Sequence, residues 1–438
     1  MLRSRYKAEI SVFLSLLFLL LVAVVIALLE SVSFHVSKNI ARGEVGLALY
    51  SVFGEYHRLL FEEYHILALD GSYGVASFSE QNLLNRIRYY GKLDMEHELT
   101  ALQLLTDNQG RVFREQVLLS LDREEEYEPR KDFLALLNFE EVSERDEEHF
   151  EVLKARMSDK IDQHKEELLF WVLPSEFHVF NTEQSPLIET LSQRRLNNGF
   201  GNIPNNNSVY ELPARMLFDD YIVENFAFAT SSFSRGKDEG VLSFEVEYVI
   251  AGQESEWANL IQVASDILLI RCISNYALFS KEPILKDQAA VVAELMPFAS
   301  SIEPQEIEKL ILLWIFWESV LEVKSLYRDG RVPVEKTVEQ WQLSLTDTVD
   351  PELDISIHEA KTISEGWDYQ DFLRVLLYRM DEELKAMRTM GCIEENFRQR
   401  IGLSDFYMDH LIVKLYVENI VRTHGNKQYQ FPAVYGYR

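Results

Sequence analysis

The sequence predicts an α+β protein: an N-terminal transmembrane helix continuing into a long amphipathic stalk helix, then a mostly helical head with a small, mainly antiparallel sheet. Three patterns carry this prediction. Residues 10–29 are apolar and uncharged, residues 41–59 repeat apolar side chains at helical spacing, and residues 411–420 alternate apolar and polar side chains. The length of 438 residues and the 47% hydrophobic content exclude a disordered chain and leave room for several modules.

The apolar run from Ile10 to Leu29 reads ISVFLSLLFLLLVAVVIALL. As a helix it is about 30 Å long, the thickness of a bilayer core. A secretory signal peptide has a shorter apolar core of about 7–15 residues, followed by small residues at a cleavage site. This run is longer and ends in Leu-Leu-Glu-Ser, so we predict a retained membrane helix rather than a removed signal.

The flanking charges predict the orientation of this helix. Arg3, Arg5 and Lys7 precede it, and Glu30 borders its other end. Because positively charged flanks tend to stay in the cytoplasm, we expect a cytoplasmic N-terminus and an extracytoplasmic head. The expected location is therefore the cell membrane, crossed once, with the lipid bilayer as a partner.

The chain is strongly acidic, with 71 Asp and Glu residues against 43 Lys and Arg residues and a net charge of -28. This charge repels phosphate backbones and argues against a nucleic-acid partner. Two acid-rich patches, 122–128 and 140–151, invite a calcium interpretation. Both lack the ligand spacing and turn glycine of oxygen-ligand sites, which favours a solvated face.

Composition divides the chain into segments: a basic leader at 1–9, the transmembrane helix at 10–29, a stalk helix at 30–70, a first, mostly helical head module at 71–196, an Asn/Gly/Pro-rich loop at 197–213 and a second, α+β head module at 214–438. One face of the stalk carries apolar residues three and four apart: Ala41, Val45, Ala48, Val52, Tyr56 and Leu59. We expect this face to pack on the head or on other subunits.

Within the head, periodicity predicts helices near 80–91, 165–171, 256–280, 286–296, 304–327 and 369–390, and strands near 98–106, 242–250, 411–420 and 428–431. The last two strands form a terminal hairpin. The apolar stretch from Leu310 to Trp317 is too short to cross a bilayer and indicates a buried core helix.

The sequence contains no HExxH, GxSxG, Walker A or GxGxxG motif. The formal match to S-x-x-K from Ser4 to Lys7 lies in the leader, outside any head. We therefore predict that the protein is not an enzyme and has no catalytic residues, no cofactor and no metal site.

Two residue pairs have both a functional and a structural interpretation. His57 and His65 can share a stalk face, but without ligand spacing a packing role is favoured over a metal site. Glu245 and Glu247 share a face of the predicted strand and can form a carboxylate pair for acid–base chemistry. The favoured alternative is that they neutralise Arg271 or another core cation.

The tryptophans and cysteines are interpreted in the same way. The helical spacing of Trp314 and Trp317 indicates core residues first, with a sugar or peptide platform that includes Trp341 and Trp367 as the alternative. The two cysteines, Cys272 and Cys392, exclude a disulfide framework. One bridge between them is open, and two buried free thiols are favoured.

Several segments together carry a family resemblance: residues 7–16, 55–64, 244–252, 259–260 with 270–271, 314–318, 326–336 with Trp341, and 369–377. They resemble a Firmicutes family of single-pass membrane proteins of unknown function. Its members are associated with tight-adherence (Tad) type pilus or secretion systems and are pseudopilin-like. The resemblance implies a structural or assembly role, with other subunits of the apparatus as partners.

The resemblance also implies a candidate prepilin-type cleavage site after Ala8, which would leave Glu9 as the first residue. Pilins usually carry a glutamate at the fifth position after the cut, and this chain has Phe13 there. The head is larger than that of a major pilin, which favours a minor, tip or assembly-associated subunit. The alternatives are a cell-surface binding or adhesion module and, less favoured, a membrane-tethered enzyme.

Overall fold

A computed structural model describes residues 2–74, 77–92, 95–121, 147–174, 191, 194–204, 211–230, 240–295, 304–348, 363–423 and 427–437. The chain forms two compact units. The first, here called the sheet unit, comprises Met1–Asp107, Asn197–Asn205 and Asp409–Arg438. The second, the helical unit, comprises Asn108–Leu196 and Asn206–Met408. The helical unit is therefore inserted into the sequence of the sheet unit.

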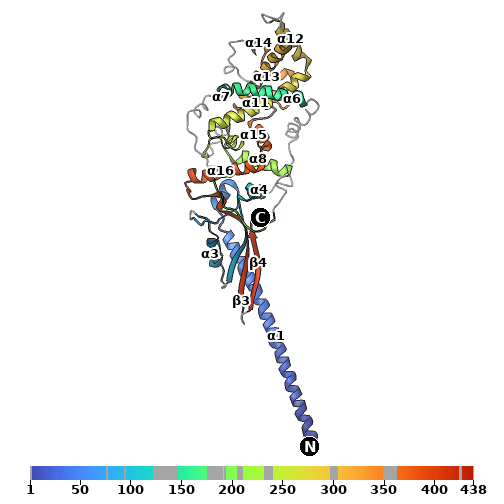
Figure 1. Cartoon of the computed structure of the whole chain (residues 1–438), viewed down its shortest axis with the longest axis vertical. Helices are drawn as coiled ribbons and strands as arrows, with labels where there is room; N and C mark the ends of the chain where they lie inside the picture. Colours follow the sequence, from blue (N-terminus) through green and yellow to red (C-terminus); the bar gives the residue numbers. More distant parts are fainter. Residues whose placement is uncertain are drawn as a thin grey trace. The chain divides into compact units, whose positions relative to one another are not determined.

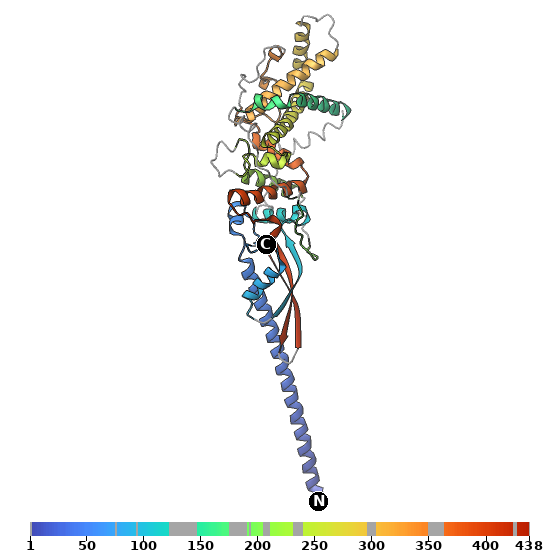
Figure 2. The same cartoon turned by 60° about the vertical axis from the view of Figure 1, so that its left-hand side comes forward.

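The sheet unit contains α1 (Leu2–Phe53), α2 (Arg58–Tyr64), β1 (Leu69–Asp70), α3 (Glu80–Tyr90), β2 (Met95–Leu104), β3 (Leu411–Thr423) and β4 (Lys427–Gly436) (Figure 1). β3 pairs antiparallel with β2 on one side and with β1 and β4 on the other. The predicted small antiparallel sheet is thus confirmed, as are the strand near 98–106 and the terminal hairpin. Both views show β3 and β4 lying alongside α1 (Figures 1 and 2).

The register joins strands that are distant in sequence. Met95 lies opposite Val421, and Leu104 opposite Ile412. Phe200, from the loop predicted at 197–213, forms a bridge with Leu102 of β2. This part of the loop therefore belongs to the sheet unit.

The helical unit contains α4 (Asp107–Leu121), α6 (Glu147–Gln163), α7 (Lys165–Val172), α8 (Leu212–Asn225), α10 (Glu245–Ala251), α11 (Glu256–Lys281), α12 (Pro283–Leu295), α13 (Pro304–Leu326), α14 (Leu345–Thr348), α15 (Tyr369–Arg379) and α16 (Glu382–Glu395). The apolar helix α11 lies at its centre and packs against α6, α7, α10, α12 and α13. The predicted helices near 256–280, 286–296 and 304–327 are confirmed. The overall prediction of an α+β protein is confirmed as well.

Two predicted elements are wrong. The predicted strand at 242–250 is largely the helix α10, because its glutamates are buried with their apolar neighbours and the alternation in sequence is not an alternation of burial. The predicted helix at 369–390 is two helices, α15 and α16. The chain turns between them, and the Asp381 side chain caps α16 by accepting hydrogen bonds from the backbone N–H groups of Glu383 and Leu384.

The structure also groups the chain differently from the predicted modules. The stalk predicted at 30–70 ends as one helix at Phe53 and continues as α2 and β1. The modules predicted at 71–196 and 214–438 each contribute to both compact units. Local composition marked the loop near 197, but it carries no information about which distant strands pair.

Candidate functional site

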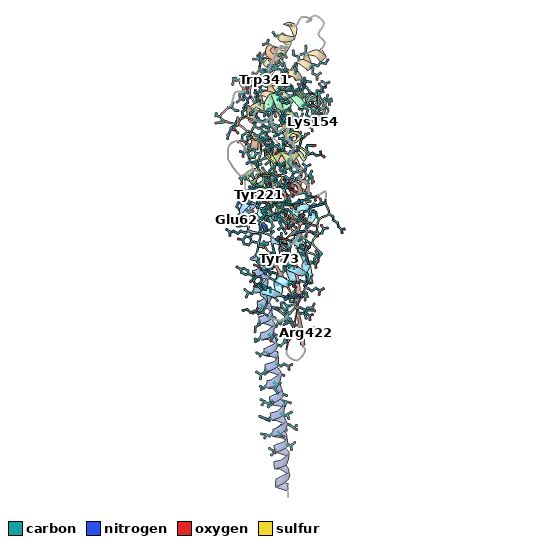
Figure 3. The ribbon with its side chains drawn as sticks, turned by 90° about the vertical axis from the view of Figure 1, so that its left-hand side faces the viewer. Glu62, Tyr73, Lys154, Tyr221, Trp341 and Arg422 are labelled. Atoms are coloured by element: carbon teal, nitrogen blue, oxygen red, sulfur yellow. The ribbon has the colours of Figure 1, made fainter. Side chains whose placement is uncertain are left out.

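The N-terminal part of α1 is an exposed apolar helix. Its side chains from Ile10 to Leu29 are all exposed, and Phe18 is 70% exposed. Its most apolar window has a mean hydropathy of 3.3, and none of that window is buried. By length and composition this helix can cross a membrane, as both membrane anchors and signal sequences can. In Figure 3 it extends alone beyond the end of the sheet.

A second helix, α11, passes the same length and composition test. Its apolar window is 61% buried inside the helical unit. Burial of this kind is typical of a core helix in a water-soluble fold. Of the two helices in the described residues that pass this test, α1 is therefore the one whose apolar window is exposed.

The C-terminal part of α1 packs against the sheet. Ala41, Val45, Ala48 and Val52 are each at most 1% exposed. They share one hydrophobic cluster with residues of α3, β2, β3 and β4: Leu83, Ile87, Leu102, Leu415, Val417 and Phe431. The predicted apolar face is confirmed over this stretch. Tyr56 and Leu59 follow the end of α1 and are 37% and 39% exposed, so the face does not extend to them.

α1 and β4 run in the same direction. The rings of Phe34 and Tyr429 lie 6.2 Å apart, and those of Tyr50 and Tyr435 lie 6.3 Å apart. The axial rise between these contacts is about 24 Å along the helix and about 20 Å along the strand. The end of β3 and the start of β4 therefore lie at the end of the sheet that is nearest to the exposed apolar part of α1.

An ion pair fastens the end of α1 to α3. The Arg86 guanidinium binds both carboxylate oxygens of Glu55, with Nε at 2.8 Å from Oε2. The Tyr90 hydroxyl donates a hydrogen bond of 2.6 Å to Glu55 Oε1. The hydrogen bonds from Arg86 lower the pKa of Glu55 below its ordinary value, despite partial burial. These contacts hold the residues that follow α1 against α3.

Replacing Gly43 and Gly46 with alanine is expected to stabilise α1. A Cβ atom at either position meets nothing within 4 Å, and a glycine inside a helix costs about 1 kcal/mol relative to alanine. Amide hydrogen exchange of α1 should slow in the double variant. The control is Gly71→Ala, whose Cβ would come within 2.6 Å of Phe78, and which should destabilise the sheet unit. Faster exchange in the double variant would contradict this account.

The candidate cleavage residues Ala8 and Glu9 lie in the first turns of α1, which begins at Leu2. Phe13 follows on the same helix and is 66% exposed. Nothing in this geometry tests cleavage, which stays a prediction.

Glu245 and Glu247 are both buried on α10, and neither pairs with Arg271. Glu245 accepts hydrogen bonds from the backbone N–H of Ala227 at 3.0 Å and from Asn396 at 2.6 Å. Glu247 accepts from the backbone N–H of Ala229 at 2.8 Å and from the Tyr369 hydroxyl at 2.7 Å. The suggestion that they neutralise Arg271 is therefore wrong. Their observed role is to hold the segment at 227–229 against α10.

Burial raises the pKa of Glu247 to about 7, so this carboxyl group gains protons on folding. A folded-state pKa above the unfolded value means that stability falls as the pH rises from about 4.5 to 7. Glu247→Gln removes this titration. We therefore expect the free energy of unfolding of the variant, relative to that of wild type, to rise by on the order of 3 kcal/mol as the pH goes from 4.5 to 8. Urea unfolding of the full chain in detergent, followed by tryptophan fluorescence, measures it. The exposed Glu254→Gln is the control; an identical slope in Glu247→Gln would refute the assignment.

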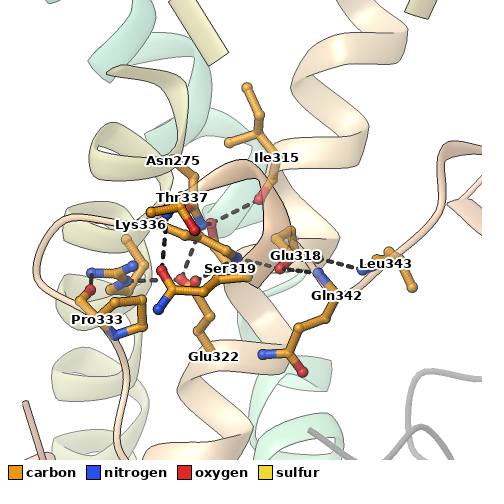
Figure 4. A network of polar contacts seen from close by, with 12 residues as sticks. Asn275, Ile315, Glu318, Ser319, Glu322, Pro333, Lys336, Thr337, Gln342 and Leu343 are labelled. Atoms are coloured by element: carbon orange, nitrogen blue, oxygen red, sulfur yellow. Dashed lines mark hydrogen bonds and ion pairs between the residues drawn. The ribbon is translucent and has the colours of Figure 1, made fainter. Parts of the chain in front are cut away.

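Arg271 instead belongs to a buried polar network between α11, α13 and the segment after α13. Figure 4 shows this network around Glu318, Glu322 and Lys336. Its Nε donates to Glu322 at 2.8 Å, and Lys336 donates to Glu322 at 2.7 Å and also to Glu318. Glu318 accepts the backbone N–H groups of Gln342 and Leu343 at 2.8 and 2.7 Å. Two carboxylates and two cations thus pair inside the core and hold the chain at 333–343 in place.

A second buried network joins α4, α8 and α16. Lys385 donates to Asp219 and, at 3.0 Å, to Glu382. Arg114 and Arg215 each lie 2.9 Å from a Glu382 oxygen. Burial raises the pKa of Asp219 to about 7. Neither network was predicted from the sequence. For the first network, the available signal was the presence of Glu318 and Glu322 within the apolar helix α13.

The remaining candidate residues have packing roles. Trp314 is buried, donates from its indole to the Leu343 carbonyl at 2.8 Å and packs on Trp341 with ring centroids 5.0 Å apart. Trp317 packs on Trp171 at 4.9 Å, and Trp367 is buried. The interpretation of Trp314 as a core residue is confirmed, whereas Trp317 is only half-buried.

His57 caps the N-terminus of α2 through its ring nitrogen, and His65 caps the C-terminus of the same helix. Cys272 and Cys392 are buried free thiols, as favoured from the sequence. Within the described ranges, no group of three or more His, Cys, Asp or Glu side chains is placed to hold a metal ion. The acidic patch at 122–128 and most of the patch at 140–151 lie outside those ranges.

Together these features define a class of protein: an α+β fold in which, over the ranges that the structure describes, the long exposed apolar helix is N-terminal and the buried polar networks around Glu322 and Lys385 join packed helices. The chain belongs to a family of unknown function, DUF5702, whose family model matches residues 147–423, more than half of the chain. The match runs from the start of α6 to the end of β3. No curated protein and no solved structure matches the chain.

Proposed function

We propose that this chain is a membrane-anchored, extracytoplasmic structural or assembly component of a pilus-like apparatus, a minor pseudopilin-like subunit of a Tad-type pilus or secretion system. The observation that supports this proposal is the division of α1. One helix has an exposed apolar N-terminal part and a C-terminal part buried on an antiparallel sheet. In pilins and pseudopilins, a helix of this kind anchors the subunit and also packs inside the filament.

The helical unit supports the assignment to a minor rather than a major subunit. It is inserted in the sequence between β2 and β3, and it makes up the larger part of the chain. A major pilin is repeated along a filament and carries a smaller head. A large inserted unit suits a subunit that is present in few copies, at a tip or at the assembly site.

The charge distribution supports an extracytoplasmic head. Arg3, Arg5 and Lys7 precede the apolar helix, whereas the net charge of the chain is -28, so the head carries the acidic excess. Positive flanks favour the cytoplasmic side of a membrane. The buried Glu245, Glu247 and Glu322 have structural partners, and the proposed role requires no catalytic group.

N-terminal sequencing of the membrane-associated protein, combined with protease treatment of intact cells, tests this proposal. A chain that starts at Glu9 and whose head is digested from outside supports pseudopilin-like processing. An intact Met1 with a digested head removes processing and leaves the anchored component. A head that resists protease until the cells are lysed contradicts the proposal.

Site-specific photo-cross-linking tests the assembly role. The cross-linker replaces Leu47, which is 55% exposed on α1, and in the control it replaces Leu119, which is 55% exposed on α4. We expect the Leu47 position to capture chains that themselves carry an N-terminal apolar helix, and the Leu119 position not to capture them. Capture of the same chains at both positions, or of none at Leu47, contradicts packing of α1 in an assembly.

A further inference from the structure

The end of the sheet unit nearest to the exposed part of α1 carries a distinct set of side chains. Phe34, Lys38 and Arg42 of α1 lie beside Tyr429 of β4, and these four residues are here called the basal cluster. Arg422 marks the same end of the sheet in Figure 3. All four residues of the cluster are at least partly exposed.

The two cations of the basal cluster are held by aromatic rings. Lys38 Nζ lies 4.4 Å from the centroid of the Tyr429 ring. The Arg42 guanidinium carbon lies 5.7 Å from the same ring and 5.9 Å from that of Phe431. Within the described part of the chain neither cation forms an ion pair, so both remain able to bind an external anion.

The spacing along α1 places Phe34 at the level of the lipid headgroups and the two cations of the basal cluster on the water side of that layer. If the hydrocarbon core ends near Leu29, Phe34 lies about 7 Å, Lys38 about 14 Å and Arg42 about 20 Å beyond it. The headgroup layer on each side of a bilayer is about 5–8 Å thick. Helical side chains tilt toward the N-terminus of their helix, which here is the bilayer side, and long basic side chains extend toward the headgroups.

We propose that the basal cluster binds the phosphate headgroups of a bilayer that contains anionic phospholipid, on the side of the membrane where the head lies. Lys38 and Arg42 supply the charge, and Phe34 and Tyr429 supply rings suited to the interface between lipid and water. In a chain of net charge -28, this local cationic contact offsets repulsion between the head and an anionic surface. The inference rests on the membrane-anchor part of the proposed function.

The test uses the full chain in lipid nanodiscs with a fluorophore on Gln428→Cys, an exposed position next to Tyr429. The native cysteines are buried, which keeps the labelling selective. Quenching by headgroup-nitroxide lipids, anionic or zwitterionic, gives their relative association near the label. The cations of the leader lie across the bilayer, about 30 Å away, and do not affect this readout. A label on Val434→Cys, about 20 Å further along β4, reports background quenching.

We expect the anionic lipid to associate more strongly near Gln428→Cys, by about fivefold for each cation. The double variant Lys38→Gln with Arg42→Gln should bring the ratio close to one. The swap Lys38→Arg with Arg42→Lys should keep the ratio high. The charge-matched Arg58→Gln with Lys414→Gln, away from the basal cluster, should also leave it high.

A ratio near one in the wild-type chain, or an equal fall in both double glutamine variants, would overturn the inference while leaving the anchor intact. A chain that is not retained in the nanodisc would overturn the inference and the membrane anchor together.

Discussion

Replacing Glu322 with alanine is expected to lower the free energy of unfolding of the helical unit by about 3–5 kcal/mol. Glu322 is fully buried and accepts hydrogen bonds from Arg271, Asn275 and Lys336 at 2.8, 2.9 and 2.7 Å. Without this carboxylate, two buried cations share the single remaining carboxylate of Glu318. The loss should be large because an uncompensated buried charge has neither water nor a counterion around it.

Urea unfolding followed by tryptophan fluorescence measures this loss, because all six tryptophans lie in the helical unit. The control is Glu308→Ala, which removes the exposed partner of Arg156 at 2.5 Å and should cost less than about 1 kcal/mol. Equal losses in the two variants would contradict the assigned role of the buried network.

The stabilisation by Glu322 should also depend on pH. Burial alone raises the pKa of this group, but the charges of Arg271 and Lys336 outweigh burial and lower the pKa to about 2. Since the folded-state pKa lies below the unfolded value, the stabilisation is present above about pH 4.3 and is lost as the pH falls toward 2. The difference between wild type and Glu322→Ala should shrink over this window, and a constant difference would argue against an ionised Glu322.

Placing lysine at Leu16, Leu20 and Val24 together is expected to abolish membrane association. The three positions lie in the apolar run and are 62%, 62% and 50% exposed. A lysine near the bilayer centre costs about 2.5–3.5 kcal/mol, whereas leucine or valine gains a few tenths, so the triple change costs about 10 kcal/mol. Fractionation of cells should move the protein out of the membrane pellet.

The matched control carries alanine at the same three positions and should stay with the membrane, because the rest of the run remains apolar and uncharged. A triple-lysine variant that pellets with membranes as wild type does would show that α1 is not what attaches the protein.

Features encoded in local sequence were predictable. The apolar run, the buried face at Ala41–Val52 and the terminal hairpin each follow from a short periodic pattern. The same holds for the helices near 256–280, 286–296 and 304–327. The buried tryptophans were predictable in the same way, because Trp314 lies in an apolar helix. Such patterns indicate which side of a helix or strand is buried.

Features that depend on distant partners were not predictable. β2 pairs with β3, which lies more than 300 residues further along the chain. Across this pair, His97 Nδ1 lies 2.6 Å from Asn419 Oδ1. No local pattern indicates that pairing, and without it the insertion of the helical unit is invisible. The alternation at 242–250 misled for a related reason. Glu245 and Glu247 occupy the polar positions of a strand-like alternation, but they lie on a helix, and each accepts a backbone N–H group from the segment at 227–229.

The candidate site was predictable only in part. The exposed apolar helix follows from composition alone, and so does the positive leader. The basal cluster does not, because Lys38 and Tyr429 come together only when β4 packs along α1. The buried networks around Glu322 and Lys385 likewise depend on the packing of helices that are remote in sequence.

Labelling of Val434→Cys in intact cells with a membrane-impermeant maleimide tests the central claim most directly. Val434 is 49% exposed on β4, and the native cysteines are buried. The account predicts that the introduced thiol is labelled before lysis and that the labelled protein is recovered in the membrane pellet. A thiol that reacts only after lysis would place the head in the cytoplasm, and a labelled protein in the soluble fraction would show that α1 is not retained; either result contradicts a membrane-anchored extracytoplasmic subunit.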